Sequence, residues 1–129
     1  RNTVIGEGFR NQDGQGGHAE EIAIQSCATQ EEIRGTTVIT TLEPCTDRPS
    51  RGRRFCSEIL IHFGVKKVII GLLDPNPEIR GRGDGLLRKN RIAVGYFPSG
   101  LSAQIWEMNR KFIEKHTGED FKTVFLYKS

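Results

Sequence analysis

The sequence predicts an α/β protein in which part of the sheet is parallel. Residues 36–41 are rich in β-branched residues, which favours a strand. Residues 65–74 are almost continuously apolar, which is typical of a strand buried on both faces. Segments with apolar residues at helical spacing alternate with these strands along the chain. Such alternation favours a layered sheet in which helical crossovers connect parallel strands.

The first half of the chain is expected to contain two strands, one helix and two loops. Pro44 ends the second strand, because proline cannot donate to a sheet ladder. Gly35 separates that strand from the helix before it. The expected elements are a glycine-rich strand within 3–11, a loop at 10–17, a helix over 18–29, a strand at 36–41 and a polar loop at 46–54.

The second half is expected to contain further helices and strands. Gly64 follows a short helical segment at 55–63, and we expect it to be the C-cap, since glycine readily adopts the left-handed conformation. Apolar residues recur at helical spacing from Leu101 onward, which predicts a C-terminal helix over residues 101–118. The other expected elements are a strand at 65–74, a loop at 75–83, a short helix at 84–92, a strand at 93–97 and a terminal strand or extended tail at 121–128.

Composition limits the possible classes of protein. The chain has 129 residues, 36% of them hydrophobic, so residues 1–129 are expected to form one domain, either alone or as a fragment of a longer chain. No apolar run approaches the ~20 residues of a membrane-spanning helix, so we expect no membrane association. The net charge of +3 is too small to indicate a nucleic-acid partner by itself.

The three cysteines, Cys27, Cys45 and Cys56, are too few and odd in number for a disulfide framework. In a reducing compartment such cysteines are more often buried, metal-bound or catalytic, so we expect a cytoplasmic location. Cys27 falls on the apolar face of the helix expected over 18–29, and we assign it to the core.

A histidine, a glutamate and two cysteines form the pattern H-x-E … P-C … C. His18 and Glu20 stand at the start of an expected helix, and Cys45 and Cys56 flank the polar loop. Catalytic zinc sites use three protein ligands of these types and keep the fourth position for water. This order is the signature of zinc deaminases, although ten residues separate the two cysteines here instead of two.

The chemistry of the pattern gives each residue a role. Glu20 is suited to take a proton from the attacking water and to deliver protons to a leaving nitrogen. The alternative is that His18 and Glu20 form an ordinary helix start and that the cysteines are structural. A structural zinc site is less favoured, because such sites usually have four ligands and only three are evident.

Together with other segments, these residues resemble the cytidine deaminase superfamily and, within it, the deaminase domain of the riboflavin-biosynthesis enzyme RibD. The resemblance covers nearly the whole chain, through the blocks "VIGEGF", "GGHAE", "VITTLEPC", "GVKKVIIGLLDPNPEIRGRG" and "IAV". It implies a three-layer α/β/α mixed sheet from which the family's first helix and first strand are missing. That strand would lie between residues 3–9 and the strand at 37–42, so we expect an upstream segment or another chain to fill its place.

The resemblance also implies an activity, which is the zinc-dependent hydrolytic deamination of a pyrimidine with release of ammonia. By this resemblance His18, Cys45 and Cys56 are the ligands of Zn²⁺. Glu20 is then the proton shuttle.

The RibD members of the family act on a diaminopyrimidinone that carries a ribose phosphate. By resemblance, Asp74 and Asn76 contact the sugar-phosphate part of the substrate. Arg51, Arg53 and Arg54 lie in the loop between the cysteines, where guanidinium groups suit a phosphate. We therefore expect a small phosphorylated, nucleotide-like substrate.

Two other functions stay open at this point. The same arginines suit a phosphate backbone, so a deaminase acting on cytosine or adenine within DNA or RNA is an alternative. The aromatic content of 8% and the lack of an aromatic residue among these arginines disfavour base stacking. A catalytically inactive zinc-bound binding module is the third possibility, which the presence of Glu20 disfavours. For partners, we expect a homo-oligomer or a place in a larger multidomain chain.

Overall fold

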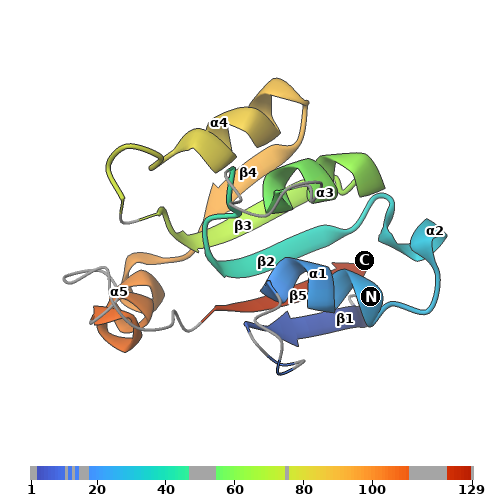
Figure 1. Ribbon diagram of the computed structural model, residues 1–129, viewed down its shortest axis with the longest axis horizontal. Coiled ribbons are helices and arrows are strands. Elements are labelled where there is room, and N and C mark those ends of the chain that lie inside the picture. The colour runs from blue at the N-terminus through green and yellow to red at the C-terminus, as the bar shows by residue number, and fades with distance from the viewer. Residues whose placement is uncertain are drawn as a thin grey trace.

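The computed structural model describes residues 3–10, 12, 14, 18–46, 55–74, 76–110 and 122–128 of the chain. Its helices and strands alternate as expected, and part of the sheet is parallel (Figure 1). In chain order they are β1 (Thr3–Phe9), α1 (Ala19–Gln25), α2 (Gln30–Ile33), β2 (Thr37–Leu42), α3 (Cys56–Phe63), β3 (Lys67–Leu72), α4 (Arg82–Lys89), β4 (Ala93–Tyr96), α5 (Ser99–Met108) and β5 (Thr123–Lys128).

The boundaries differ from the expected ones in two helical regions. The helix expected over 18–29 is shorter, since α1 ends at Gln25, and a separate helix that was not expected, α2, follows where Thr29 and Glu32 form a capping box. The helix expected over 101–118 is present as α5, which starts at Ser99. The part of that helix expected beyond Arg110 lies outside the described residues, as do residues 47–54 of the polar loop expected at 46–54. Gly64 has a φ of 74° and ends α3, as expected.

The sheet has five strands in the order β1-β5-β2-β3-β4. Strands β2, β3 and β4 are parallel, whereas β5 runs antiparallel to both of its neighbours, β1 and β2. The carboxyl ends of β1, β2 and β3 and the beginning of β5 therefore meet at one edge of the sheet. Segments that follow or precede these strands are brought together there.

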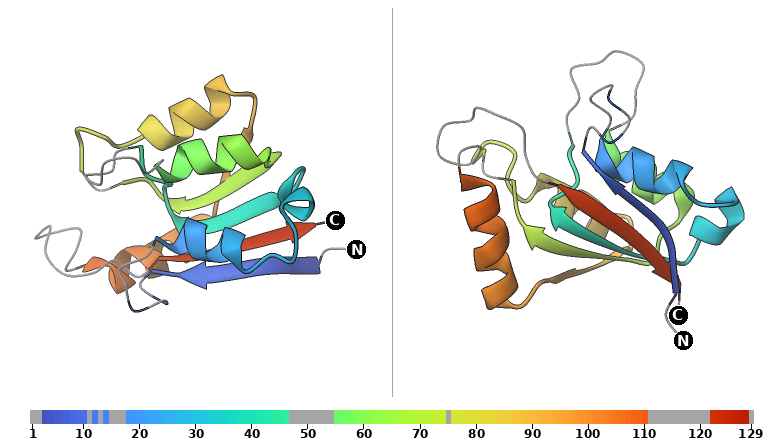
Figure 2. Two further views of the ribbon diagram at one scale, coloured as in Figure 1. Left: turned by 45° about the vertical axis from the view of Figure 1, so that its right-hand side comes forward. Right: turned by 90° about the horizontal axis from the view of Figure 1, so that it is seen from below.

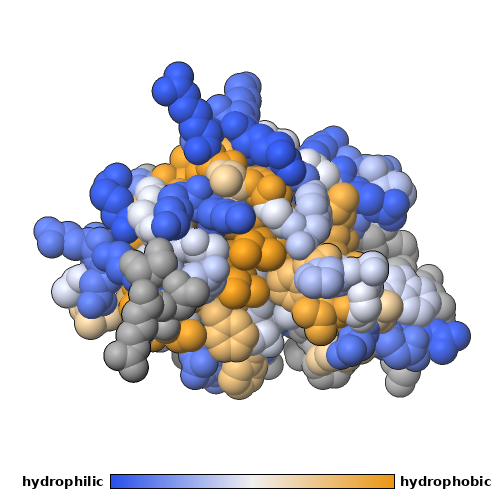
Figure 3. Space-filling view, turned by 180° about the vertical axis from the view of Figure 1, so that it is seen from behind, coloured by the Kyte–Doolittle hydropathy of each residue, from blue (hydrophilic) through white to orange (hydrophobic). Residues whose placement is uncertain are grey.

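Helices cover the two faces of the sheet unequally. Figure 2 shows α1, α3 and α4 on one face and α5 on the other, so the expected three-layer α/β/α arrangement is confirmed. Seen from behind, the face that carries α5 still shows apolar side chains at its surface (Figure 3). Two large aromatic side chains, Tyr96 at the end of β4 and Trp106 on α5, are 45% and 39% exposed.

The core lies between the sheet and the layer of α1 and α3. Its fully buried side chains include Val38, Val68, Leu60 and Leu126. Helix α1 approaches β1 closely because the strand has glycines on that side. A Cβ atom at Gly6 would lie 2.6 Å from the Ala23 carbonyl oxygen and one at Gly8 would lie 2.7 Å from the Ala19 carbonyl oxygen, so the glycines set how near α1 comes to the sheet along its length.

One strand separates β1 from β2, as expected, but its identity differs from the expected one. The chain's own β5 lies there, rather than an upstream segment or another chain. Val124 and Leu126 of β5 are fully buried and alternate with half-buried residues, a pattern that suits an interior strand. Pairing on both sides satisfies backbone groups that a gap would leave open.

Within the part of the chain that the structure describes, no helix has the length and apolar character required to cross a membrane.

Candidate metal centre

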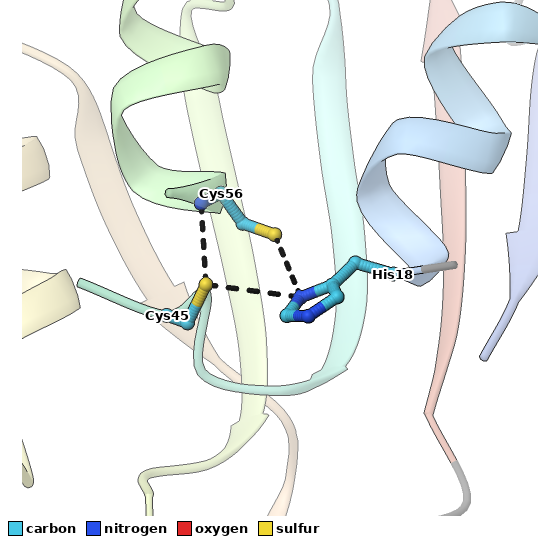
Figure 4. A group of neighbouring side chains, drawn as sticks. All are labelled: His18, Cys45 and Cys56. Carbon is cyan, nitrogen blue, oxygen red and sulfur yellow. Dashed lines mark hydrogen bonds between the residues drawn. The ribbon is translucent and has the colours of Figure 1, made fainter. Parts of the chain in front are cut away.

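His18, Cys45 and Cys56 converge at the edge of the sheet where β2 ends (Figure 4). His18 is the N-cap residue of α1, Cys45 follows β2, and Cys56 is the first residue of α3. Their ligand atoms all lie within 4.8 Å of one another. His18 Nδ1 is 3.3 Å from Cys56 Sγ and 3.8 Å from Cys45 Sγ. The sequence prediction that these three residues share one site is consistent with this geometry.

Backbone contacts hold the two cysteines together despite their separation in sequence. The backbone N–H of Cys56 donates a hydrogen bond to Cys45 Sγ at 3.2 Å. The N–H of Ser57 donates to the Cys45 carbonyl at 3.0 Å, and its hydroxyl donates to the Pro44 carbonyl at 3.0 Å. The N-terminus of α3 thus clamps the segment after β2, and its partial positive charge favours a thiolate there.

The pKa values of the two cysteine thiols are shifted in opposite directions. A hydrogen bond from the Cys56 thiol lowers the pKa of Cys45 to about 4, although burial acts in the opposite direction. The same contact, together with burial, raises the pKa of Cys56 far above its usual value. Two thiolates this close repel each other unless a cation lies between them. One imidazole and two sulfurs form a donor set that zinc prefers, so Zn²⁺ fits this cluster.

Glu20 lies in the first turn of α1 and is fully buried. Its Oε2 accepts a hydrogen bond from the Lys122 ammonium at 2.5 Å. Its Oε1 is buried and has no hydrogen-bond partner among the described residues. A buried carboxylate oxygen without a partner is costly, and it indicates a position where a molecule outside the chain binds.

The sequence interpretation missed Lys122. Burial alone would lower the pKa of this lysine, but the Glu20 carboxylate raises it above its ordinary value, with a further contribution from Cys56. Lys122 directly precedes β5, and a lysine before an alternating strand gives no signal of burial. Its position follows only from the pairing of β5 with β1 and β2.

Glu43, for which we expected a structural role at the end of β2, connects three segments. Its Oε1 accepts backbone N–H groups from Asp74 at 2.8 Å and Gly81 at 3.0 Å. Its Oε2 accepts the N–H of Asp84 at 3.0 Å, within the first turn of α4. A carboxylate at a helix N-terminus is favourable, so Glu43 fixes the segment from Asp74 to α4 against the end of β2.

Asp74 and Asn76, the expected substrate contacts, are half-buried and shape the turn after β3. Asp74 Oδ1 accepts the N–H of Asn76 at 2.9 Å, and Asn76 Oδ1 accepts the N–H of Glu78 at 3.0 Å. Both side chains therefore order this loop, and their contact with a substrate stays a prediction. Arg51, Arg53 and Arg54 lie outside the described residues.

The contact between α4 and Glu43 predicts opposite effects of alanine at two glycines of one helix. A Cβ atom at Gly83 would lie 2.3 Å from the Pro44 carbonyl oxygen and 3.0 Å from Glu43 Cγ, whereas one at Gly85 would meet nothing within 4 Å. Gly83→Ala should lower the free energy of unfolding by about 1–3 kcal/mol through overpacking. Gly85→Ala should raise it by about 0.5–1 kcal/mol through helix propensity. Urea unfolding measures both, and equal effects at the two positions would contradict the close approach.

Comparison with known proteins agrees with this geometry. The family described as the cytidine and deoxycytidylate deaminase zinc-binding region matches residues 1–72. RibD of Actinobacillus pleuropneumoniae is 42% identical over 92 residues, which are 70% of this chain and 23% of that protein. The diaminohydroxyphosphoribosylamino-pyrimidine deaminase of Buchnera aphidicola subsp. Acyrthosiphon pisum is 38% identical over 115 residues, 88% of this chain and 73% of that one.

A solved structure is similar as well. Acinetobacter baumannii RibD, form 1, superposes with a TM-score of 0.71 at 35% identity, covering 88% of this chain and 31% of that chain. The chain thus spans about a quarter to a third of the RibD proteins that it matches and most of the Buchnera deaminase. This chain belongs to the zinc-binding cytidine and deoxycytidylate deaminase family, and within it resembles the deaminase domain of RibD.

Proposed function

We propose that this chain catalyses the hydrolytic, zinc-dependent deamination of a diaminopyrimidinone that carries a ribose phosphate. One observation carries the proposal, which is the convergence of His18, Cys45 and Cys56 beside the buried carboxylate of Glu20. The substrate class is supported by the name of the Buchnera relative, a diaminohydroxyphosphoribosylamino-pyrimidine deaminase.

His18, Cys45 and Cys56 would hold the zinc ion. When bound by three protein ligands, zinc leaves one position for water and lowers the pKa of that water toward neutrality. The two cysteine sulfurs supply two negative charges, so the dication and its ligands are together neutral and tolerate burial. The contact from the Cys56 N–H keeps Cys45 Sγ oriented within the cluster.

Glu20 would move the protons of the reaction. It takes a proton from water while the water oxygen bonds to the ring carbon that bears the amino group. Glu20 passes that proton to the adjacent ring nitrogen, then takes the second proton from the new hydroxyl group and delivers it to the amino nitrogen; the carbon–nitrogen bond breaks, and ammonia leaves as the ring carbonyl forms. Burial of Glu20 excludes bulk water from this exchange, and Oε1, which has no partner among the described residues, is free to take part in it.

Residues around the loops would recognise the rest of the substrate. Asp74 and Asn76, which lie in the turn that Glu43 fixes, would contact the sugar hydroxyls. Arg51, Arg53 and Arg54 would bind the phosphate through charge-assisted hydrogen bonds.

The metal assignment predicts one zinc per chain, lost on removal of either cysteine ligand. Cys45→Ser and Cys56→Ser should bind less than one zinc per chain and unfold at lower temperature, because metal binding is coupled to folding. Cys27→Ser is the matched control, since Cys27 lies just after the end of α1, packs partly buried against the core and is outside the cluster. Elemental analysis with thermal unfolding tests this, and full zinc content in both ligand variants would refute the assignment.

Glu20→Gln separates proton transfer from metal binding. The variant should keep one zinc per chain and lose turnover by a factor of roughly 10²–10⁴, the usual contribution of general acid–base catalysis. Ammonia release from the phosphorylated diaminopyrimidinone measures it. Near-normal turnover in this variant would show that another group moves the protons. Release of ammonia only from single-stranded oligonucleotides by the unmodified protein would instead favour a nucleic-acid deaminase.

The loop arginines predict a preference for the phosphorylated substrate. Replacement of Arg51, Arg53 or Arg54 by alanine should raise KM for the phosphorylated compound by roughly tenfold to a hundredfold, as expected for loss of a charge-assisted contact. KM for the dephosphorylated compound should stay nearly constant, and Arg91→Ala, at an exposed position, serves as the control. An equal rise in KM for both compounds would contradict phosphate recognition.

A further inference from the structure

Lys122 places a buried positive charge directly beside Glu20. Its side chain is 7% exposed, and Glu20 is 0% exposed. Its ammonium donates to Glu20 Oε2 at 2.5 Å and to the Glu43 carbonyl at 3.3 Å. A lysine is almost never buried without a charged partner, so the burial of each residue depends on the other.

The backbone around Lys122 is anchored on both sides. The N–H of Arg10 donates to the Lys122 carbonyl at 3.0 Å, and the N–H of Thr123 donates to the Thr41 hydroxyl at 3.0 Å. These contacts tie the beginning of β5 to the ends of β1 and β2. The backbone that carries the Lys122 side chain is therefore fixed at this edge of the sheet.

Charge balance explains why a cation is needed at this point. Two thiolates neutralise a zinc dication, and His18 is a neutral ligand when it binds metal. The carboxylate of Glu20 would then be a buried negative charge in excess. Lys122 supplies a positive charge that balances the Glu20 carboxylate, so the zinc, its ligands and this ion pair together sum to zero.

The two oxygens of Glu20 have different surroundings. Oε2 is held by Lys122, while Oε1 has no partner among the described residues. Because Lys122 holds Oε2, rotation of the carboxylate is restricted, and the orientation of Oε1 is fixed as well. A proton-transferring group gains from such fixed geometry.

We propose that Lys122 is the positioning residue of Glu20: its ammonium holds Oε2 and neutralises the carboxylate, which leaves Oε1 to exchange protons with water and the leaving amino group. The effect of Lys122 on catalysis rests on the proposed deaminase function. The ion pair itself rests only on geometry.

The test compares Lys122→Met with Lys128→Met, which removes an exposed lysine at the far end of the same strand. In the zinc-loaded protein, Lys122→Met should lower kcat for the phosphorylated diaminopyrimidinone by roughly 10–100-fold, the usual effect of losing a supporting partner. KM and zinc content should change little, and Lys122→Arg should recover part of kcat. In a Glu20→Gln background, Lys122→Met should cause no further loss. Unchanged kcat, or an equal loss in both backgrounds, would overturn the proposal.

A measurement without turnover separates this proposal from the proposed function. Lys122→Met and Glu20→Gln should each lower the urea midpoint of the zinc-loaded protein, because each leaves a buried polar group unpaired. The double variant should recover part of the loss, since the two effects are coupled. Absence of ammonia release by the unmodified protein would refute the proposed function, while simple addition of the two midpoint shifts would refute the ion pair.

Discussion

The buried contact between the Lys122 ammonium and the Glu20 carboxylate joins the last strand of the sheet to the metal cluster. A carboxylate and an ammonium each pay several kcal/mol to leave water, so neither is stable in this position without the other. Strand β5 brings Lys122 to the sheet edge, and α1 brings Glu20 together with His18. The packing of α1 against β1, which the strand glycines permit, therefore also determines the geometry of the site.

A second carboxylate organises the opposite side of the same edge. Glu43 accepts three backbone N–H groups and in this way fixes the turn after β3 and the start of α4. It stands two residues before Cys45, so the metal cluster and the turn that contains Asp74 and Asn76 share one short segment as their support. Displacement of this segment would move a ligand and the proposed substrate contacts together.

Much of the site was predictable because its chemistry is local in sequence. His18 and Glu20 fall at a helix start, and Cys45 follows a strand that is predicted by its β-branched residues. In an α/β fold these positions lie at the same edge of the sheet, so their convergence was expected. The burial of Lys122 was not predictable, because it depends on the pairing of β5 with β1 and β2. Strand β5 follows β2 by about eighty residues in the sequence. The sequence also left β5 open as a strand or tail. Its antiparallel insertion is a long-range choice that local patterns do not encode.

The central claim is that one zinc, its three ligands, Glu20 and Lys122 form a single charge-balanced assembly. The most direct test is a crystal structure of the zinc-loaded protein with anomalous data collected at the zinc edge. The account predicts one zinc about 2.3 Å from both cysteine sulfurs and about 2.0–2.1 Å from a ring nitrogen of His18, with Lys122 bound to one oxygen of Glu20 and none of the carboxylate on the metal. Zinc bound elsewhere, Glu20 as a ligand, or Lys122 turned to solvent would contradict it.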